Sequence, residues 1–204
     1  MSSNSHWMTL GIVVFFGCNR CDTQKQTLQT AAVQTVHETL PSVAHPDYAN
    51  WSRFPENSFV RRRKVVSNSS GEVVVTTKMW LETKTEEFVS VGSRVTVKRP
   101  DEPIAENDAD LVSFPATYRL PKGMEESQFY LPSMNAKKTG TEAIKVGTSE
   151  FQATIYEWEE SSEAGPTTVK LWRSDDIPGR FLRQELYTKS SETMSTEEVT
   201  EVEL

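Results

Sequence analysis

The sequence predicts a mainly β protein built on a single antiparallel meander sheet, with a short N-terminal helix or tether. Segments rich in Val, Thr and aromatic residues recur between polar turns, and helical spacing of apolar residues is nearly absent after residue 57. Turn-forming pairs such as Gly147-Thr148 and Pro178-Gly179 separate these segments. A chain of 204 residues is long enough for one such domain with a sizeable core.

The start of the chain is typical of an export signal. Uncharged, mostly apolar residues run from Met8 to Gly17, a stretch of about ten residues that matches a signal-peptide core and is half of what a membrane-spanning helix needs. Gly17 then supplies a small residue directly before Cys18. Residues 15–18 resemble the lipobox of bacterial lipoproteins, which implies lipidation of Cys18 and removal of residues 1–17. Secretion with another cleavage site, or a buried segment of a cytosolic domain, are the alternatives.

The second cysteine does not indicate a redox or metal site. Cys18 and Cys21 have C-x-x-C spacing, but the sequence has no further cysteine pair. Lipidation of Cys18 would leave Cys21 without a partner, so the mature fold would depend on its core alone. Residues 18–46 are polar and contain Pro41 and Pro46, which favours a flexible tether over a short helix.

Residue 47 begins the predicted β domain, which extends to residue 204. Its first feature is a turn between two prolines that carries Tyr48, Trp51 and Phe54 at a spacing of three. This spacing places the three aromatic rings on one face. We expect them to form a plug that packs on the sheet.

About eight strands follow, together with a short strand that Pro115 interrupts. Gly92 marks a position where a bulge is expected, and residues 122–136 form an irregular excursion. The expected strands span residues 59–67, 72–82, 87–98, 111–120, 139–146, 149–159, 167–174, 180–188 and 196–204.

The charge distribution argues against nucleic-acid binding. The formal net charge is −7, whereas a protein that neutralises phosphates needs a basic surface. The one basic run, residues 61–64, lies on a predicted strand, so its four charges divide between the two faces. A solvated or edge-protecting strand is the favoured interpretation. Contact with anionic lipid head groups is the alternative.

The domain resembles a loosely defined group of bacterial envelope proteins. The resemblance covers residues 47–204 and implies a strongly curved sheet, an open half-barrel similar to the lipoprotein-carrier fold that holds acyl chains in its concavity. It rests on turn and packing signatures and supports a fold more than a function. These signatures are Trp51-Ser-Arg-Phe54 before Asn57-Ser-Phe-Val60, Val146-Gly147 with Phe151 and Tyr156, and Val169-Lys-Leu-Trp172 before Ile177-Pro-Gly179.

The residue types of the domain exclude several chemistries. His6, His37 and His45 all precede the strand-rich region, as do both cysteines. Catalytic Ser/His/Asp and Cys/His sets and histidine zinc sites therefore cannot form within it, and phosphate-binding glycine motifs are absent. The sequence predicts no catalytic residue, no cofactor and no metal site. The oxygen-rich loop 106–110 lacks the glycine and distal Glu of a calcium-binding loop.

Carboxylates and tryptophans leave two hypotheses open. Acidic residues at 101–110, 157–163 and 175–176 keep a carboxylate-only hydrolase as the weakest alternative. Trp80, Trp158 and Trp172 are expected to pack within the sheet, although such rings also stack on sugars.

The sequence thus predicts a lipid-anchored protein of the cell envelope that faces the periplasm or the exterior. We expect a non-enzymatic binding module for an apolar ligand or a partner protein, without nucleic-acid binding. An assembly component that pairs through a strand edge, such as residues 197–204, is the alternative.

Overall fold

The computed structural model describes residues 41–68, 71–162, 165–191 and 193–204. The signal core, Cys18, Cys21, His6 and His37 lie outside the described residues, so lipidation and cleavage stay predictions. Among the described residues, no helix is long and apolar enough to cross a membrane.

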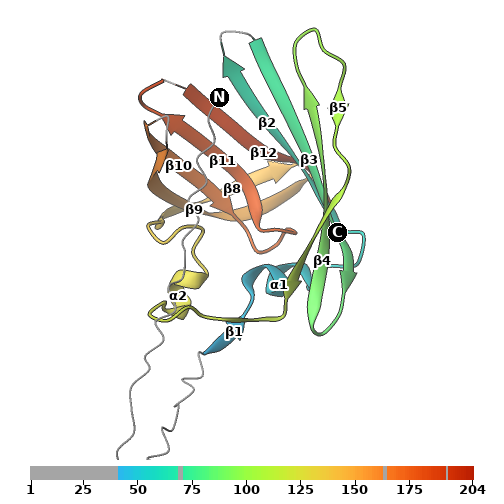
Figure 1. The fold of residues 1–204 in the computed structure, drawn as a ribbon, viewed down its shortest axis with the longest axis vertical. Helices are drawn as coiled ribbons and strands as arrows, with labels where there is room; N and C mark the ends of the chain where they lie inside the picture. The colour runs from blue at the N-terminus through green and yellow to red at the C-terminus, as the bar shows by residue number, and fades with distance from the viewer. Residues whose placement is uncertain (1–40, 69–70, 163–164, 192) are drawn as a thin grey trace, which may run out of the picture. The chain divides into compact units, whose positions relative to one another are not determined.

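A ten-stranded sheet dominates the structure (Figure 1). All of its strand pairs are antiparallel, and the order is β5-β4-β3-β2-β12-β11-β10-β9-β8, with β6 also paired to β4. The strands are β2 (Phe59–Asn68), β3 (Gly71–Lys84), β4 (Phe88–Lys98), β5 (Ala105–Glu106), β6 (Asp110–Pro115), β8 (Lys137–Val146), β9 (Ser149–Ser162), β10 (Gly165–Arg173), β11 (Phe181–Thr188) and β12 (Thr193–Glu203).

Smaller elements lie outside this sheet. β1 (Ser42–Ala44) pairs with β7 (Thr117–Arg119) in a separate two-stranded sheet. Two short helices, α1 (Pro46–Trp51) and α2 (Glu126–Phe129), precede β2 and β8 respectively. β1 lies within the range predicted as tether, so regular structure begins before the expected boundary at residue 47.

The mainly β class, the antiparallel meander and the short helix near the N-terminal side are confirmed. A strongly curled sheet is not detected. The sheet consists of two meanders, which we call its arms: β2 to β6 form one and β8 to β12 form the other. The arms join where the first long strand, β2, pairs with the last strand, β12. Residues 197–204, predicted as a strand edge, are covered in part: Glu197 and Glu198 pair with both β11 and β2, whereas Val199, Glu201, Val202 and Glu203 have register partners on β2 alone among the described strands.

The turn predictions agree with the backbone. Gly147 has a φ of 59° in the two-residue connection between β8 and β9. Pro178 and Gly179 occupy the centre of a type II turn, in which Gly179 has a φ of 73° and the Arg180 N–H donates to the Ile177 carbonyl at 3.2 Å. Glycine fits these positions because a side chain would strain the left-handed backbone.

Gly92 does not form the predicted bulge. It lies opposite Trp80 in regular register, and the register shift falls on the partner strand between Leu81 and Thr83. A Cβ atom at Gly92 would overlap the indole ring of Trp80. The glycine therefore provides room for a cross-strand aromatic side chain.

Helix α1 packs on one face of the sheet, which we call the inner face. Trp51, 1% exposed, forms a core cluster with Leu81, Val89 and Val91 of β3 and β4. Because side chains alternate along a strand, Met79 shares the face of Leu81, and its register partner Val60 places alternate residues of β2 there too. The opposite side of the sheet is the outer face.

A second core cluster lies in the other arm of the sheet. Val146 and Ala153, from the β8–β9 hairpin, share this cluster with Trp172, Leu182 and Val199. Strands that are separated in the sheet order therefore pack through one common core. Ile177, from the turn before β11, belongs to the same cluster, so this core fixes the turn that carries Arg180.

Candidate functional site

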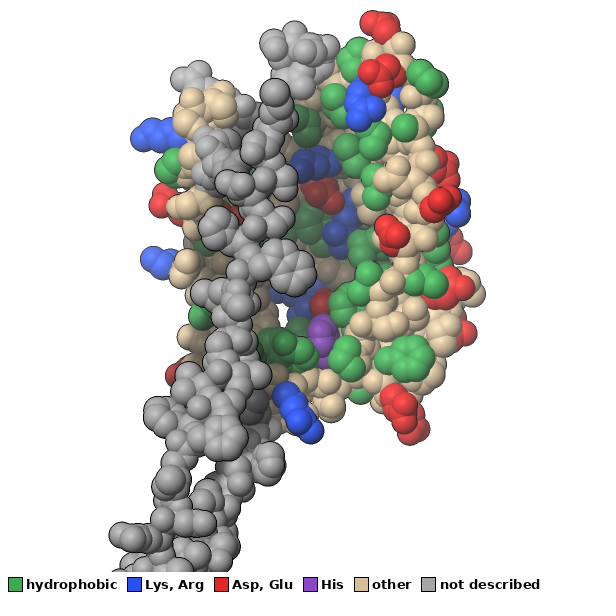
Figure 2. All heavy atoms as spheres, viewed as in Figure 1, with side chains coloured by type: hydrophobic (Ala, Val, Ile, Leu, Met, Phe, Trp, Pro, Cys, Tyr) green, Lys and Arg blue, Asp and Glu red, His purple; other side chains and the backbone are tan. Residues whose placement is uncertain are grey.

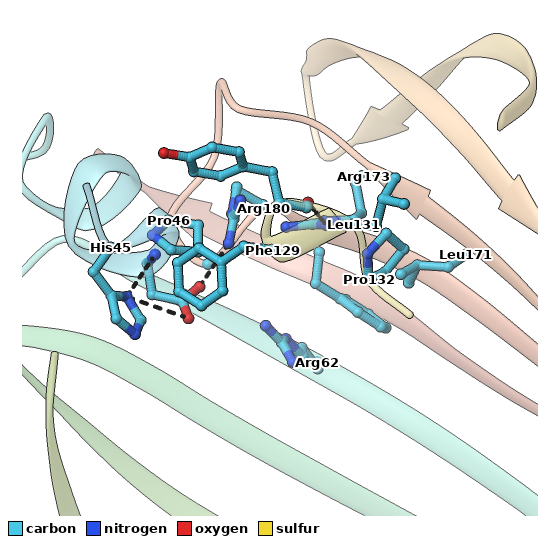
Figure 3. Close-up of a pocket in the computed structure, with 13 residues that line it drawn as sticks. His45, Pro46, Arg62, Phe129, Leu131, Pro132, Leu171, Arg173 and Arg180 are labelled. Carbon is cyan, nitrogen blue, oxygen red and sulfur yellow. Dashed lines mark hydrogen bonds and ion pairs between the residues drawn. The ribbon is translucent and has the colours of Figure 1, made fainter. Parts of the chain in front are cut away.

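A cavity of about 400 Å³ lies on the inner face beside the start of α1. Figure 2 shows basic and hydrophobic side chains within a hollow on this face, and Figure 3 shows the residues that line the cavity. The lining comes from the α1 start, β2, the end of α2 and the loop after it, and the β10–β11 hairpin. It comprises His45, Pro46, Asp47, Arg62, Phe129, Tyr130, Leu131, Pro132, Leu171, Arg173, Gly179, Arg180 and Phe181.

Arg62 enters the cavity from the centre of β2. Its guanidinium carbon lies 4.2 Å from the ring centroid of Phe181, a cation–π contact. Its neighbours Arg61 and Arg63 point to the outer face and form ion pairs with Glu201 and Glu72. The predicted division of the basic run between two faces is therefore confirmed, but a solvated strand is not, because Arg62 lies in the cavity lining.

Arg173 and Arg180 reach the same cavity from the two ends of the β10–β11 turn. Arg173 donates from Nη1 to the Tyr130 carbonyl at 3.3 Å. Arg180 donates from Nη2 to Asp47 at 2.9 Å, and its side chain is 12% exposed. Three guanidinium groups and one carboxylate thus line the cavity, which gives it an excess of positive charge.

Burial changes the acidity of two of these cations. Desolvation lowers the pKa of Arg62, and the charges of Glu197 and Asp47 partly oppose this effect. Desolvation also lowers the pKa of Arg173, and the positive charge of Arg180 lowers it further. Both side chains remain charged at neutral pH, because arginine starts from a very high pKa.

The remaining walls of the cavity are largely apolar. Leu171 of β10 and Phe181 of β11 contribute from the sheet, while Phe129, Leu131 and Pro132 contribute from α2 and the loop that follows it. Apolar surface beside a few convergent polar groups is typical of small-molecule sites.

An aromatic cluster fixes the chain around α2. The rings of Tyr118 and Phe129 stack at 5.0 Å, and the His45 ring lies 5.4 Å from that of Phe114. Tyr130 adds a hydrogen bond from its hydroxyl to the Ala44 carbonyl at 3.2 Å. These contacts hold the α2 segment against β1, β6 and β7.

Helix α1 is fastened to the cavity through Asn50, which is 3% exposed. Its Nδ2 donates to the carbonyls of Asp175 and Ile177 at 3.2 and 3.0 Å, and its Oδ1 accepts from the Gly179 N–H at 2.7 Å. These hydrogen bonds set the distance between α1 and the turn that carries Arg180.

The aromatic residues expected to form a plug lie at one end of the inner face. Trp51 and Phe54 are buried, and Tyr48 donates from its hydroxyl to the Thr85 carbonyl at 2.9 Å. None of the three lines the cavity. Trp51 and Tyr48 therefore pack on β3 and β4, and the space between Arg62 and Leu171 is left unfilled by the three rings.

The three strand tryptophans have separate surroundings. Trp80 lies over Gly92 and donates to Glu82. Trp158 is 8% exposed and packs with Val169, and Trp172 is 4% exposed within the second core cluster. Burial of Trp158 and Trp172 agrees with packing inside the domain, and none of the three tryptophans lines the cavity.

Most of the acidic residues that the sequence singled out lie outside the cavity lining. Among the described residues, Asp47 is the one carboxylate that lines the cavity, while Asp175 and Asp176 line a neighbouring hollow together with Arg173 and Arg180. No group of three His, Cys, Asp or Glu side chains suited to a metal ion occurs in the described part of the chain.

Sequence reasoning missed the arginines of the cavity, and it was wrong to leave His45 outside the domain, because this side chain lines the cavity beside Asp47 and packs on Phe114. Because side chains alternate along a strand, Arg62 shares one face of β2 with Val60 and Lys64. The sequence does not show that other segments cover this face. Arg173 and Arg180 flank the predicted tight turn, and their proximity follows from the turn geometry.

No family model matches the chain, and no curated protein matches it significantly. Among solved structures, it is similar to a candidate exported protein with a YmcC-like fold from Bacteroides fragilis, with a TM-score of 0.45 and 10% identity over 74% of this chain and 97% of the other. It is also similar to a candidate lipoprotein from Parabacteroides distasonis, with a TM-score of 0.43 and 11% identity over 73% and 96% of the two chains.

A third similar structure is a candidate outer membrane lipoprotein-sorting protein domain from Vibrio parahaemolyticus. Its TM-score is 0.26, with 6% identity over 76% of this chain and 88% of the other. The chain is thus similar to structures described as exported or lipoprotein-related.

Proposed function

We propose that this chain is a non-enzymatic binding module that takes an apolar ligand into the inner-face cavity. The observation that carries this proposal is the cavity itself, walled by Leu131, Leu171 and Phe181 and not filled by the aromatic residues of α1. Burial of an apolar ligand there would remove apolar surface from water on both partners, which is favourable.

The proposal includes an envelope location and an open half-barrel. Lipidation at Cys18 would anchor the chain to a membrane, and residues after it would act as a tether. The core cluster that joins Val146 and Ala153 to Val199 supports a half-barrel, because it brings the β8–β9 hairpin towards β12, from which it is separated in the sheet order.

Binding of N-phenyl-1-naphthylamine, an uncharged apolar dye, tests this function. We expect its fluorescence to increase on addition of the protein. Leu131→Trp adds volume on the loop that borders the cavity and is expected to reduce the increase. Met134→Trp is the matched control, since Met134 lies on the same loop, is 65% exposed and does not line the cavity. No increase with the wild-type protein, or equal effects of both variants, would contradict the proposal.

Co-purification provides a second test. Full-length protein extracted in detergent should carry lipid that mass spectrometry detects, and Leu131→Trp should carry less. Lipid retained equally by both proteins would contradict use of this cavity.

A second candidate function is assembly through a strand edge, and exposed apolar residues at β5 and β6 favour it. Ile104, Leu111 and Val112 are 64%, 63% and 51% exposed, and among the described strands β6 pairs with β4 alone. A free strand edge beside apolar side chains is suited to pairing with another chain. Val112→Lys should abolish such association, which is measured as the amount of partner protein that the chain retains. An unchanged amount of retained partner would contradict this second function.

A further inference from the structure

We propose that the polar end of the inner-face cavity is an anion site, and that the ligand is an anionic amphiphile with a carboxylate or phosphate group on an apolar chain. This inference rests on the proposed function and deepens it, because it names the chemical class of the ligand. Arg62, Arg173 and Arg180 would contact the anion, and the apolar walls would contact the chain.

The first support is the convergence of three cations from separate parts of the chain. Arg62 comes from β2, Arg173 from the end of β10 and Arg180 from the turn before β11, and all three line one cavity (Figure 3). Bringing like charges together in a partly buried space is unfavourable unless a negative charge accompanies them. Asp47 supplies one such charge and is paired with Arg180. One carboxylate cannot neutralise three guanidinium groups.

The second support is the incomplete pairing of Arg62 and Arg173. Among the described residues, no carboxylate lies within ion-pair distance of either side chain. Arg62 makes its contact with the ring of Phe181 instead, and Arg173 bonds to a neutral carbonyl. Both cations therefore retain donors for a further acceptor.

The third support is a set of buried donors without acceptors. The Nε atoms of Arg62 and Arg180 are buried and have no hydrogen-bond partner within the described structure. A buried donor without an acceptor is costly, whereas a bound carboxylate or phosphate accepts strong, charge-assisted hydrogen bonds from guanidinium groups. The lowered pKa values of Arg62 and Arg173 agree with this arrangement, since an anion would favour their charged forms.

Neighbouring acidic residues define the extent of the site. Asp175 and Asp176 line the adjacent hollow with Arg173 and Arg180, and Asp176 also lies 4.0 Å from Arg53. Glu197 acts electrostatically on Arg62 but does not line the cavity. Arg62 and Arg173, which have no ion-pair partner among the described residues, therefore share the cavity lining with the apolar side chains of Leu171 and Phe181. Because charged and apolar side chains lie side by side in the lining, the cavity suits an amphiphile better than a simple anion.

Four compounds separate these ligand classes when titrated against the full chain below their micelle-forming concentrations. Dodecyl phosphate and dodecanoate carry an anion on an apolar chain, dodecanol carries the chain alone, and inorganic phosphate carries the anion alone. We expect dodecyl phosphate and dodecanoate to bind at least about tenfold more tightly than dodecanol or inorganic phosphate. Displacement of N-phenyl-1-naphthylamine or calorimetry measures the affinities.

Substitutions on adjacent residues of β2 provide a matched pair. Arg62→Gln should weaken binding of dodecyl phosphate by about tenfold or more while leaving that of dodecanol unchanged. Arg63→Gln, which removes a cation from the outer face, should change neither. Arg173→Gln should act like Arg62→Gln, and it decides the question if thermal unfolding shows that Arg62→Gln does not fold.

The outcomes distinguish this inference from the proposed function. Equal affinity for dodecanol and dodecyl phosphate, or equal effects of Arg62→Gln and Arg63→Gln, would overturn the anion site but leave an apolar cavity in place. Equal affinity for inorganic phosphate and dodecyl phosphate would overturn the inference that the ligand is an amphiphile. Absence of binding by every compound and by the uncharged dye would overturn the proposed function itself.

Discussion

Arg62 and Gly179 are packed so closely that a Cβ atom at Gly179 would lie 3.2 Å from Nη2 of Arg62. The same Cβ atom would lie 3.4 Å from the ring of Trp51. The glycine of the type II turn thus sits between the helix that covers β3 and β4 and a cation of the cavity. This contact connects the packing of α1 to the position of the arginine.

Gly179→Ala should therefore affect both stability and binding. The φ of 73° is unfavourable for alanine and should reduce the free energy of unfolding by about 1–2 kcal/mol. Displacement of the Arg62 guanidinium should also weaken dodecyl phosphate binding. Urea unfolding and ligand titration measure the two effects.

Gly123→Ala is the control for that variant. Gly123 has a φ of 84°, but a Cβ atom added there would have no neighbour within 4 Å. This variant should lose comparable stability and keep its ligand affinity. Equal affinity of the two variants would show that crowding at Gly179 does not position Arg62.

Asn50→Asp should destabilise the fold by about 2–3 kcal/mol. The aspartate would lose the donor that serves the Asp175 and Ile177 carbonyls and would place a negative charge against them. Asn107→Asp, at an exposed position, should have little effect on the free energy of unfolding. A small loss at Asn50, matching that at Asn107, would contradict the role of this side chain in fastening α1.

The sequence predicted the hairpins well because their signals are local. Gly147 and the Pro178-Gly179 pair specify turns through backbone preferences that need no distant contact. Pairing of β2 with β12 was not predictable in this way, since it joins the two ends of the domain. The sequence pattern also separated Arg61 from Arg62 by strand alternation. It could not show which of them would lie in a cavity, because that depends on where α1 and the α2 segment pack.

His45 should make stability depend on pH. Burial lowers its pKa below 6.5, Arg180 lowers it further, and Asp47 partly opposes both. The unfolded chain therefore binds a proton first as the pH falls, so stability should decrease as the pH falls through 6.5 towards the pKa of the folded state. The neutral ring also accepts the Asp47 N–H at Nδ1, at 3.1 Å, which protonation of that atom would prevent.

His45→Asn tests this dependence, because asparagine is a favourable N-cap that does not titrate. Its melting temperature should fall less than that of the wild type between about pH 7 and pH 5. Parallel curves for the two proteins would contradict the role of His45.

Gly92→Ala should destabilise the sheet by about 1–3 kcal/mol, because the new methyl group would overlap the ring of Trp80. Gly140→Ala is the strand control, since its Cβ atom would make an ordinary contact with Ile155 at 3.8 Å. In a Trp80→Ala background the cost at Gly92 should shrink, as chemical unfolding would measure. An unchanged cost in that background would show that the indole ring is not the cause.

Photocrosslinking with a fatty acid that carries a diazirine on its chain tests the central claim most directly. Peptide mapping of the labelled protein should place the crosslinks at the cavity walls, around Leu131, Leu171 and Phe181, and Arg62→Gln should reduce their yield. Labels concentrated instead at the exposed residues Ile104, Leu111 and Val112 would contradict binding of an anionic amphiphile in the inner-face cavity.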